Sequence, residues 1–453
     1  MSPYNIIFII NQKNILILFL VSGLILVVNK NLGGFMATYY ISANGSDAYD
    51  GLTPDTAWQT IKKINESIKG GDTVCFKRGD TFFGQIRAPK ENNTDTPTTY
   101  TSYGEGTKPI VSQYKTAHKD AWESFCEGVW RIDLSDITKF DGNQTELSTN
   151  VGFLKVDGAI KPRKIFELDK LEQQWDFYND KQHVYIKSQE NPSLLAEDIK
   201  FACNIICLPF VDNLLVEDII FIGSGAHGLS GTVNHATVKN CEFHEFGGSE
   251  LTSYFRPGVR YGNGIECWTD SSEVLVENCK FANIYDVALT LQGNKATRGW
   301  VNITFRNNVI WNCQQAFEIW SGGELENTGF QNCVFENNVC LDSGFSWGHE
   351  VRANKQFSTH LLIYQLECPL CDVTVRNNTF YNARVAPIIK SYGPQQLPDD
   401  YKIINNLFLI DPAQDIALRV KTTDEEYQAF YDKIAKNNQI IKSDFYTSPK
   451  ISE

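Results

Sequence analysis

The chain has 453 residues, of which 42% are hydrophobic and 21% are charged. This is an ordinary globular composition, and it excludes a disordered chain, a collagen-like fibre and a protein with many membrane spans. Lys and Arg number 41 against 54 Asp and Glu, which gives a net charge of −13. Because nucleic-acid binding requires a basic surface, this acidic balance argues against a nucleic-acid partner.

The N-terminus carries an apolar run at residues 15–28, with Lys13 before it and Lys30 after it. The run is short for a membrane span of about 20 residues and matches the apolar region of a signal peptide. Residues 1–35 are therefore a signal-like segment, and we expect a secreted or cell-surface protein. Two alternatives stay open, because no small-residue cleavage site follows: an uncleaved anchor, or a true start at Met36 with a cytoplasmic location.

Residues 36–112 are expected to form an N-terminal cap and the first turns of the fold. Within them, residues 56–69 predict a short helix with Asp55 as N-cap and Gly70-Gly71 as its end. One face of this helix is apolar, as a cap over a sheet end requires, and its members are Trp58, Ile61, Ile64 and Ile68. Residues 113–200 carry no repeat; we expect a lateral β excursion with strands at 129–134, 151–156 and 183–187.

From residue 213 onward one pattern recurs: alternating apolar residues, then Asn-Asn, Asn-Cys or Glu-Asp, then an apolar or aromatic residue. The first Asn or Asp of the copies falls at Asp218, Asn240, Asn278, Asn307, Asn337, Asn377 and Asn405. A period of 22 to 30 residues with two long insertions is typical of a solenoid. Because the alternation has period 2, residues 201–420 are predicted to be stacked parallel strands of an all-β fold.

Asn at a repeating turn has a physical reason. It tolerates the left-handed backbone conformation, and its amide can hydrogen-bond to the copy one coil away, which makes a ladder. Cys241 and Cys279 occupy the same register as the Asn residues at 308, 338, 378 and 406. We predict that both cysteines are buried free thiols of this turn column rather than disulfide partners.

A second column of strands lies between the turns, at residues 264–268, 288–292, 316–320, 360–364 and 386–390. Alternation predicts that the following side chains face the interior: Ile265, Cys267, Leu289, Leu291, Phe317, Ile319, Leu361, Ile363 and Ile389. The side chains predicted to face outward are Glu266, Trp268, Thr290, Gln292, Glu318, Trp320, Tyr364 and Lys390. Residues 421–453 follow the repeats. A capping box at 423–426 opens a helix with Tyr427, Phe430, Tyr431 and Ile434 on one face, which is the expected C-terminal cap.

Four short segments near the N-terminus carry a family resemblance: YYISANGSD at 39–47, DGL at 50–52, AW at 57–58 and GDTV at 71–74. Together they resemble the N-terminal cap of bacterial right-handed parallel β-helix proteins with the pectin-lyase-like fold. With the Asn repeats, the resemblance covers residues 38–410 and implies one right-handed parallel β-helix with short helical caps. Residues 177–186 are similar to a small β element of some β-helix glycosidases. The fold includes polysaccharide lyases, glycoside hydrolases, epimerases and adhesins, so the resemblance does not name the reaction.

Glu266 and Glu318 share one outward column two coils apart, which places their backbones about 10 Å apart. Inverting glycoside hydrolases hold two carboxyl groups about 6.5–9.5 Å apart, so this pair predicts an inverting acid and base. Trp268, Trp320 and Tyr364 offer flat faces that suit sugar rings, and Gln292 lies beside them. The alternative is that a neighbouring loop simply covers these residues.

Two insertions should stand along one edge of this face, at residues 247–263 and 344–359. They bring four cations into an acidic chain: Arg256, Arg260, Arg352 and Lys355. Since Arg binds carboxylates bidentately, this cluster predicts a uronate-containing polysaccharide. Surface salt bridges with Glu250 and Glu350 are the alternative.

The same cations support a second mechanism, β-elimination by a polysaccharide lyase. Arg352 or Arg256 would neutralise the uronate, and His349, His360 or Lys355 would act as base. Asp286, at the edge of the column, is a third carboxylate that could serve either scheme. A non-catalytic glycan-binding surface protein is the hypothesis from another class.

No phosphate loop, dinucleotide fingerprint or nucleophile elbow occurs, so no cofactor is expected. Cys368 and Cys371 form a lone CxxC, which is half of a zinc site at most. Asp47 and Asp50 are a weak calcium candidate, because they lack the EF-hand spacing. The expected partner is a polysaccharide substrate, with no stable protein partner.

Overall fold

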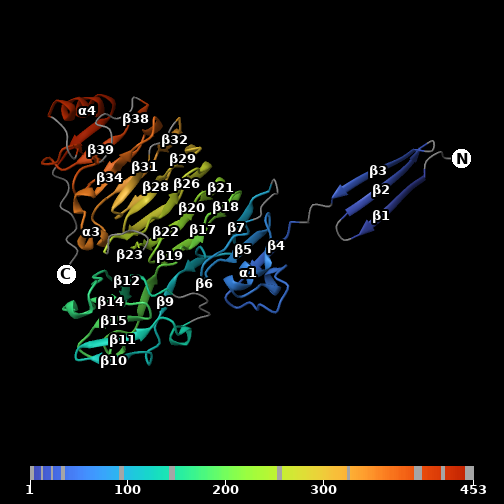
Figure 1. The fold of residues 1–453 in the computed structure, drawn as a ribbon, viewed down its shortest axis with the longest axis horizontal. Coiled ribbons are helices and arrows are strands. Elements are labelled where there is room, and N and C mark those ends of the chain that lie inside the picture. Colours follow the sequence, from blue (N-terminus) through green and yellow to red (C-terminus); the bar gives the residue numbers. More distant parts are fainter. Residues whose placement is uncertain are drawn as a thin grey trace.

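The computed structural model describes residues 5–11, 14–21, 24–31, 36–90, 96–141, 148–251, 258–323, 327–391, 400–419 and 424–443. Strands β1 (Asn5–Asn11), β2 (Asn14–Val21) and β3 (Leu24–Asn31) form an antiparallel sheet of their own, which lies apart from the remaining strands (Figure 1). No helix within the described ranges is long and apolar enough to cross a membrane. The signal, anchor and late-start interpretations of residues 1–35 stay predictions.

Three long parallel sheets make up the body of the molecule. The first sheet contains β4 (Thr38–Ile41), β5 (Thr73–Lys77), β7 (Thr98–Tyr103), β18 (Leu214–Glu217), β21 (Asn234–Lys239), β26 (Ser272–Glu277), β29 (Trp300–Arg306), β32 (Gly329–Glu336), β35 (Leu370–Arg376) and β38 (Tyr401–Ile404). The second contains β6 (Thr81–Phe83), β8 (Ile110–Ser112), β19 (Ile220–Ser224), β22 (Glu242–Phe246), β27 (Lys280–Ile284), β30 (Val309–Trp311), β33 (Val339–Leu341), β36 (Thr379–Tyr381), β39 (Leu407–Ile410) and β41 (Gln439–Lys442). The third contains β17 (Leu208–Pro209), β20 (Leu229–Gly231), β25 (Ile265–Cys267), β28 (Val287–Asn294), β31 (Gln315–Gly322), β34 (Thr359–Leu366), β37 (Ile388–Lys390) and β40 (Ala417–Arg419).

Each coil takes one strand from each sheet in turn, as β26, β27 and β28 do, and the next coil stacks on it in parallel register. The core lies between the three sheets, where inward side chains stack on their copies one coil away. Phe243 stacks on Phe281 with ring centroids 5.0 Å apart, and Phe380 stacks on Phe408 at 4.9 Å. The predicted all-β parallel β-helix is therefore confirmed.

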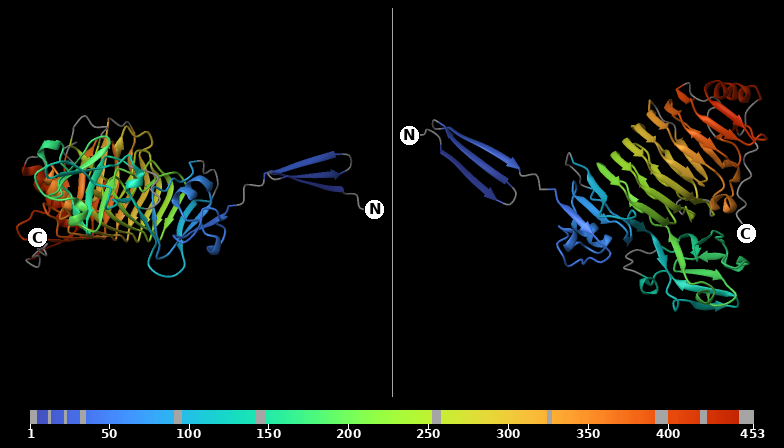
Figure 2. Two further views of the ribbon diagram at one scale, coloured as in Figure 1. Left: turned by 90° about the horizontal axis from the view of Figure 1, so that it is seen from below. Right: turned by 180° about the vertical axis from the view of Figure 1, so that it is seen from behind.

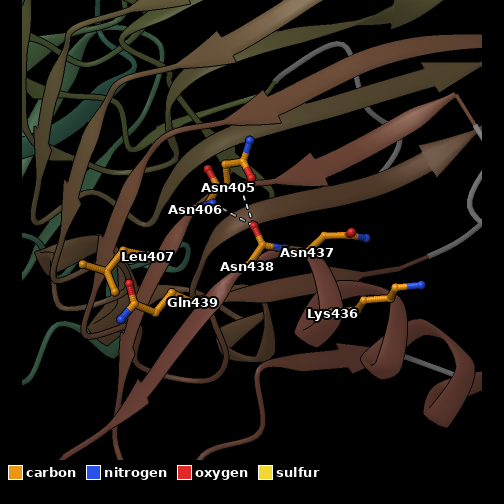
Figure 3. Close-up of a pocket in the computed structure, with 7 residues that line it drawn as sticks. All are labelled: Asn405, Asn406, Leu407, Lys436, Asn437, Asn438 and Gln439. Atoms are coloured by element: carbon orange, nitrogen blue, oxygen red, sulfur yellow. Dashed lines mark hydrogen bonds between the residues drawn. The ribbon is translucent and has the colours of Figure 1, made fainter.

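In the turn between the first and second sheets, the two Asn positions of each pair have different roles. The first Asn of each pair takes the left-handed conformation, as at Asn307 (φ 56°) and Asn337 (φ 55°). The second Asn makes the ladder: Asn308 Nδ2 donates to Asn338 Oδ1 at 3.0 Å, and Asn338 Nδ2 donates to Asn378 Oδ1 at 3.1 Å. The predicted amide ladder is confirmed. It continues through Asn406 to Asn438, in the last coil (Figure 3).

Both ends of the β-helix carry a helix. At the N-terminal end α1 (Ile61–Ser67) begins after Thr60, whose side chain accepts a hydrogen bond from the Lys63 amide at 3.1 Å. The predicted N-cap, Asp55, is therefore wrong, because it lies in a separate 3-10 turn (Pro54–Thr56). The apolar face of the helix is buried as predicted. At the other end α4 (Asp424–Asn437) packs on β38 and buries Ile434 against the core; Thr423 lies outside the described residues.

The lateral excursion leaves the β-helix after β8 and returns before β17, and Figure 2 shows it beside the stacked coils. Its strands are β9 (Tyr114–Thr116), β10 (Glu123–Cys126), β11 (Val129–Asp133), β12 (Val151–Val156), β13 (Ala159–Lys161), β14 (Phe177–Asn179), β15 (His183–Lys187) and β16 (Ile199–Cys203), with a short helix α2 (Pro192–Leu195). They form two antiparallel sheets with a core of their own. The three predicted strands of the excursion are confirmed.

Candidate active site

The outer face of the third sheet carries the predicted carboxylate column. Glu266 pairs with Thr290 in the next coil, and Thr290 pairs with Glu318 in the one after. The neighbours of each glutamate in sequence, such as Phe317 and Ile319, lie in the core, so both glutamates face away from it. Surrounding groups nevertheless cover them, because Glu266 is 4% exposed and Glu318 is 8% exposed. The predicted direction of both side chains is confirmed.

Glu266 is held by neutral hydrogen-bond donors on both carboxylate oxygens. Ser230 Oγ donates to Oε1 at 2.7 Å, Asn263 Nδ2 donates to Oε2 at 3.0 Å, and Gln292 Nε2 donates to Oε2 as well. His227 Nε2 lies 3.8 Å from Oε1. Since the His227 Nδ1 accepts the Asn263 backbone N–H at 3.0 Å, the proton of its neutral ring is on Nε2, toward Glu266. These donors fix Glu266 in one orientation.

Glu318 has a different environment. Within the part of the chain that the structure describes, no hydrogen bond reaches its carboxyl group. Burial raises the pKa of Glu318 well above its usual range, and the negative charges of Asp286 and Glu266 raise it further, while Arg352 opposes them. A raised pKa lets Glu318 hold its proton to a higher pH than an ordinary glutamate, and a proton donor needs this property.

Asp286 precedes β28 and completes the group of three carboxyl groups. Its Oδ1 accepts a hydrogen bond of 2.7 Å from Arg352 Nη1, which also donates to the Tyr285 carbonyl at 3.3 Å. The Arg352 guanidinium lies over the Tyr285 ring, 5.2 Å from its centroid. Arg352 directly follows the short helix α3 (Trp347–Val351), so the second insertion supplies the only cation that acts on Glu318 among the described residues.

Arg260 does not offer its charge to the groove, contrary to the prediction. Strands β23 (Ser249–Glu250) and β24 (Arg260–Tyr261) form a small hairpin, and the Arg260 side chain turns inward from it. It donates to the carbonyls of Gly248 and Gly152 at 2.6 Å each and of Pro162 at 3.2 Å. Its guanidinium also lies over the rings of Tyr285 and Trp347, at 5.1 and 5.9 Å. Arg260 is therefore a buried link between the excursion and the β-helix.

Two of the three predicted aromatic platforms lie together. Trp268 and Trp320 have ring centroids 6.0 Å apart, and both rings are partly exposed beside Gln292. A β-bulge after Ile319 places Gln365, not Tyr364, opposite Trp320, and Trp320 Nε1 donates to Gln365 Oε1 at 3.2 Å. Tyr364 packs on Phe357 in a separate apolar cluster, so its predicted place beside the tryptophans is wrong.

Several predicted basic site residues lie elsewhere. Ile363 pairs with Lys390, which is 2% exposed, so Lys390 has the register of an interior residue and Ile389 faces outward; the predicted alignment was one residue out of step. His360 is also enclosed. Its ring lies 5.4 Å from the core residue Phe380, its Nδ1 bonds to Ser343 Oγ at 2.8 Å, and burial lowers its pKa to about 3. Neither residue can contact a substrate in the groove.

His349 and Lys355 remain in the second insertion. His349 Nδ1 bonds to Ser358 Oγ at 2.6 Å, and burial followed by the charge of Arg384 lowers the pKa of His349. Lys355 is exposed, and its carbonyl accepts the Ser358 hydroxyl at 2.9 Å. Arg256 lies outside the described residues. The predicted roles of His349 and Lys355 stay predictions.

Sequence reasoning missed three residues that contact Glu266: Ser230, Asn263 and His227. Ser230 lies in β20 and pairs directly with Glu266, so extending the strand alignment back by one coil would have found it. Asn263 and His227 lie in turns before strands, where the alternation of apolar and polar residues does not predict the direction of a side chain.

Within the described ranges, no three His, Cys, Asp or Glu side chains converge in a way that could hold a metal ion. The calcium candidates serve the backbone instead. Asp47 accepts the amides of Gln59 and Thr60, and Asp50 accepts the Leu52 amide and the Thr56 hydroxyl. Asp is often used for such turn bonds.

Comparison with known proteins agrees with the fold. Residues 182–356 match the family model described as a right handed beta helix region. The complex of XylC with xylose has a TM-score of 0.50 at 12% identity, covering 85% of this chain and 70% of that one. An alginate lyase from Paenibacillus sp. str. FPU-7 has a TM-score of 0.43 at 14% identity, covering 84% and 93%. The resemblance to right-handed β-helix carbohydrate-active proteins is thus confirmed at the level of the fold.

One curated relative matches in sequence. A lacto-N-biosidase from Bifidobacterium longum subsp. longum is 32% identical over 83 residues, which are 17% of this chain and 5% of that protein. The chain therefore spans about one twentieth of the length of this relative.

Proposed function

We propose that the protein is a glycan-cleaving enzyme and that it acts as a glycoside hydrolase. The observation that carries the proposal is the carboxyl group of Glu318 on the outer face of a rigid sheet: burial and the Asp286 carboxyl group, which Arg352 holds, raise its pKa. A neutral and an ionised carboxyl group in one site are the two groups that hydrolysis of a glycosidic bond needs. The names of a lacto-N-biosidase and of a xylose complex among the matches support a sugar substrate.

In this scheme Glu318 gives its proton to the glycosidic oxygen as the bond to the anomeric carbon breaks. Asp286 is the second carboxyl group of the pair, because only its Oδ1 is bonded to Arg352 and its Oδ2 is available to take a proton from water or to bond to the anomeric carbon. Water supplies the hydroxyl group of the new reducing end. Glu266, whose two oxygens are already occupied by donors, contributes negative charge to the site and orients Gln292.

This assignment changes the predicted pair from Glu266 and Glu318 to Asp286 and Glu318. The predicted inversion of the anomeric configuration was based on the spacing of Glu266 and Glu318, so it does not apply to Asp286 and Glu318. NMR of the first product formed, before its anomers equilibrate, measures the stereochemistry directly.

The test is incubation with a panel of polysaccharides and oligosaccharides, followed by product analysis. New reducing ends without absorbance at about 235 nm support hydrolysis, since β-elimination leaves an unsaturated uronide that absorbs there. An unsaturated product would contradict the proposal in favour of a lyase, and binding without cleavage would contradict it in favour of a glycan-binding protein. Glu318→Gln should lower kcat/KM about 10²–10⁴-fold, whereas Glu127→Gln, at an exposed site in the excursion, should not.

A further inference from the structure

The charges around the reacting position are unfavourable for an acidic sugar. Asp286, Glu266 and Arg352 are the charged groups that act on Glu318, so two anions face one cation there. The cation is already paired, because Arg352 Nη1 lies 2.7 Å from Asp286 Oδ1. A uronate carboxylate that entered this site would meet carboxylates without a free partner at low effective dielectric.

Among the described residues, two predicted site cations, Arg260 and Lys390, do not face this charge. Arg260 is 7% exposed and donates to three backbone carbonyls, and Lys390 has the register of a core residue. Lys355 is exposed, and among the described residues it forms no ion pair with Glu266, Glu318 or Asp286. The acidic-glycan expectation depended on these side chains, so the described part of the groove no longer supports it.

The groups that do line the column are suited to uncharged sugars. Trp268 and Trp320 present partly exposed rings, which can cover the C–H face of a pyranose. Gln292 lies between them and Glu266, and its amide is a neutral group that can bond to hydroxyl or acetamido substituents. Both kinds of contact bind sugars without a countercharge.

We propose that the site takes an uncharged glycan and rejects a uronate at the sugar that lies against Asp286, Glu266 and Glu318. The inference rests on the proposed function, since it concerns the substrate of the same groove. It replaces the acidic polysaccharide expected from the cluster of four cations with a neutral one, in which a hydroxymethyl group takes the place of the C5 carboxylate.

The experiment starts from whichever glycan the panel shows to be cleaved. Its primary hydroxyl groups are oxidised to carboxylates, and kcat/KM is compared for the two forms. We expect a neutral substrate and at least about a tenfold loss on oxidation, which corresponds to about 1.4 kcal/mol. Cleavage only of uronate glycans, or faster cleavage after oxidation, would overturn the inference while leaving hydrolysis intact. A panel without any cleavage refutes the proposed function instead, and preferential binding of neutral or acidic members of the panel then decides the inference by itself.

A charge variant gives a second measurement that needs no turnover. In the Glu318→Gln background, Glu266→Gln removes one negative charge at nearly constant shape. Calorimetry should show that affinity for the oxidised oligosaccharide rises about a hundredfold relative to the neutral one, since like charges about 6 Å apart repel by that order at an effective dielectric near 20. The same comparison for Glu127→Gln should show no change. A loss of affinity for the oxidised form in Glu266→Gln would mean that Glu266 does not face the sugar.

Discussion

Two columns of stacked side chains run along this β-helix, and they differ in how their polar groups are satisfied. In the turn column every amide from Asn308 to Asn406 donates both to the next Asn and to a carbonyl of the previous coil, as Asn338 Nδ2 does to Phe305 at 3.0 Å. In the outward column Ser230, Glu266, Thr290, Glu318 and Leu362 are all different, and Glu318 receives no hydrogen bond from the described residues. Repetition therefore marks the column that stabilises the fold, and irregularity marks the column that can do chemistry.

The difference has an energetic basis. A buried amide that is fully hydrogen-bonded is stable, and leaving its partners unpaired costs about 1–3 kcal/mol for each group. A buried carboxyl group without donors is unfavourable when ionised, so the fold must tolerate it for a reason other than stability. Substitutions in the two columns should accordingly separate loss of activity from loss of stability.

The largest effect is expected at Asp286. Asp286→Asn keeps the shape and removes the ionised carboxylate, so kcat/KM should fall about 10²–10⁴-fold, as for Glu318→Gln. Asp415→Asn, an exposed aspartate in the last coil, is the matched control and should leave activity unchanged. Activity within about tenfold of the parent would exclude Asp286 as base or nucleophile and return that role to Glu266.

Substitutions in the turn column should lower the stability of the protein rather than its activity. Asn338→Ala removes the acceptor of the Asn308 backbone N–H and side-chain amide, and the donor to the Phe305 carbonyl. We expect the free energy of unfolding to fall by about 2–4 kcal/mol in urea titrations, with unchanged kcat per folded molecule. Asn354→Ala, at an exposed position without a capping bond, should change it by less than about 0.5 kcal/mol. A similarly small change for Asn338→Ala would show that the ladder is not what stabilises the turns.

The sequence predicted the repeated parts of the molecule well, and the reason is the repeat itself. Period-2 alternation gave the direction of Glu266, Thr290 and Glu318, and the common register of Cys241 with the Asn column followed from seven copies of one pattern. Alternation failed where a single residue changes the register. The bulge that displaces Tyr364 and the shift that turns Lys390 inward leave no local signature in composition.

The polar partners of the site could not be predicted, because they come from turns and insertions whose path depends on the folded chain. Arg260 and Arg352 are alike in sequence, but one donates to backbone carbonyls and the other to Asp286. Both guanidinium groups lie over the Tyr285 ring, so this contact does not distinguish them either.

The third prediction uses pH to compare the columns. The folded state raises the pKa of Glu318, so the folded protein holds this proton more tightly than the unfolded chain, in which the glutamate pKa is near its ordinary value of 4.5. The stability that the proton gives is complete below that value and is lost as pH rises through the folded pKa. Glu318→Gln should therefore unfold at a higher urea concentration than the parent at pH 8 and gain less at pH 4. Each unit of raised pKa contributes about 1.4 kcal/mol to this difference. An equal gain at both pH values would mean that folding does not raise the pKa of Glu318. Asn338→Ala, the turn-column variant, should lose equally at both pH values.

The smallest effect concerns the thiols at the start of the turn column. Cys241 Sγ donates to the Lys239 carbonyl at 3.3 Å and to Val216 at 3.7 Å, and Cys279 Sγ donates to Glu277 at 3.3 Å and to Val238 at 3.7 Å. They thus occupy the place of the Asn amides while making weaker bonds.

All twelve cysteines are free. A structural disulfide contributes about 2–5 kcal/mol, so its reduction would lower Tm by several degrees. We expect dithiothreitol to shift Tm by less than about 1 °C, and Cys279→Ser to be tolerated better than Asn338→Ala, because a hydroxyl can still donate to the same carbonyl. A large loss of Tm on reduction would mean that two of these thiols are joined, and that the turn column is stabilised by a covalent bond as well as by its hydrogen bonds.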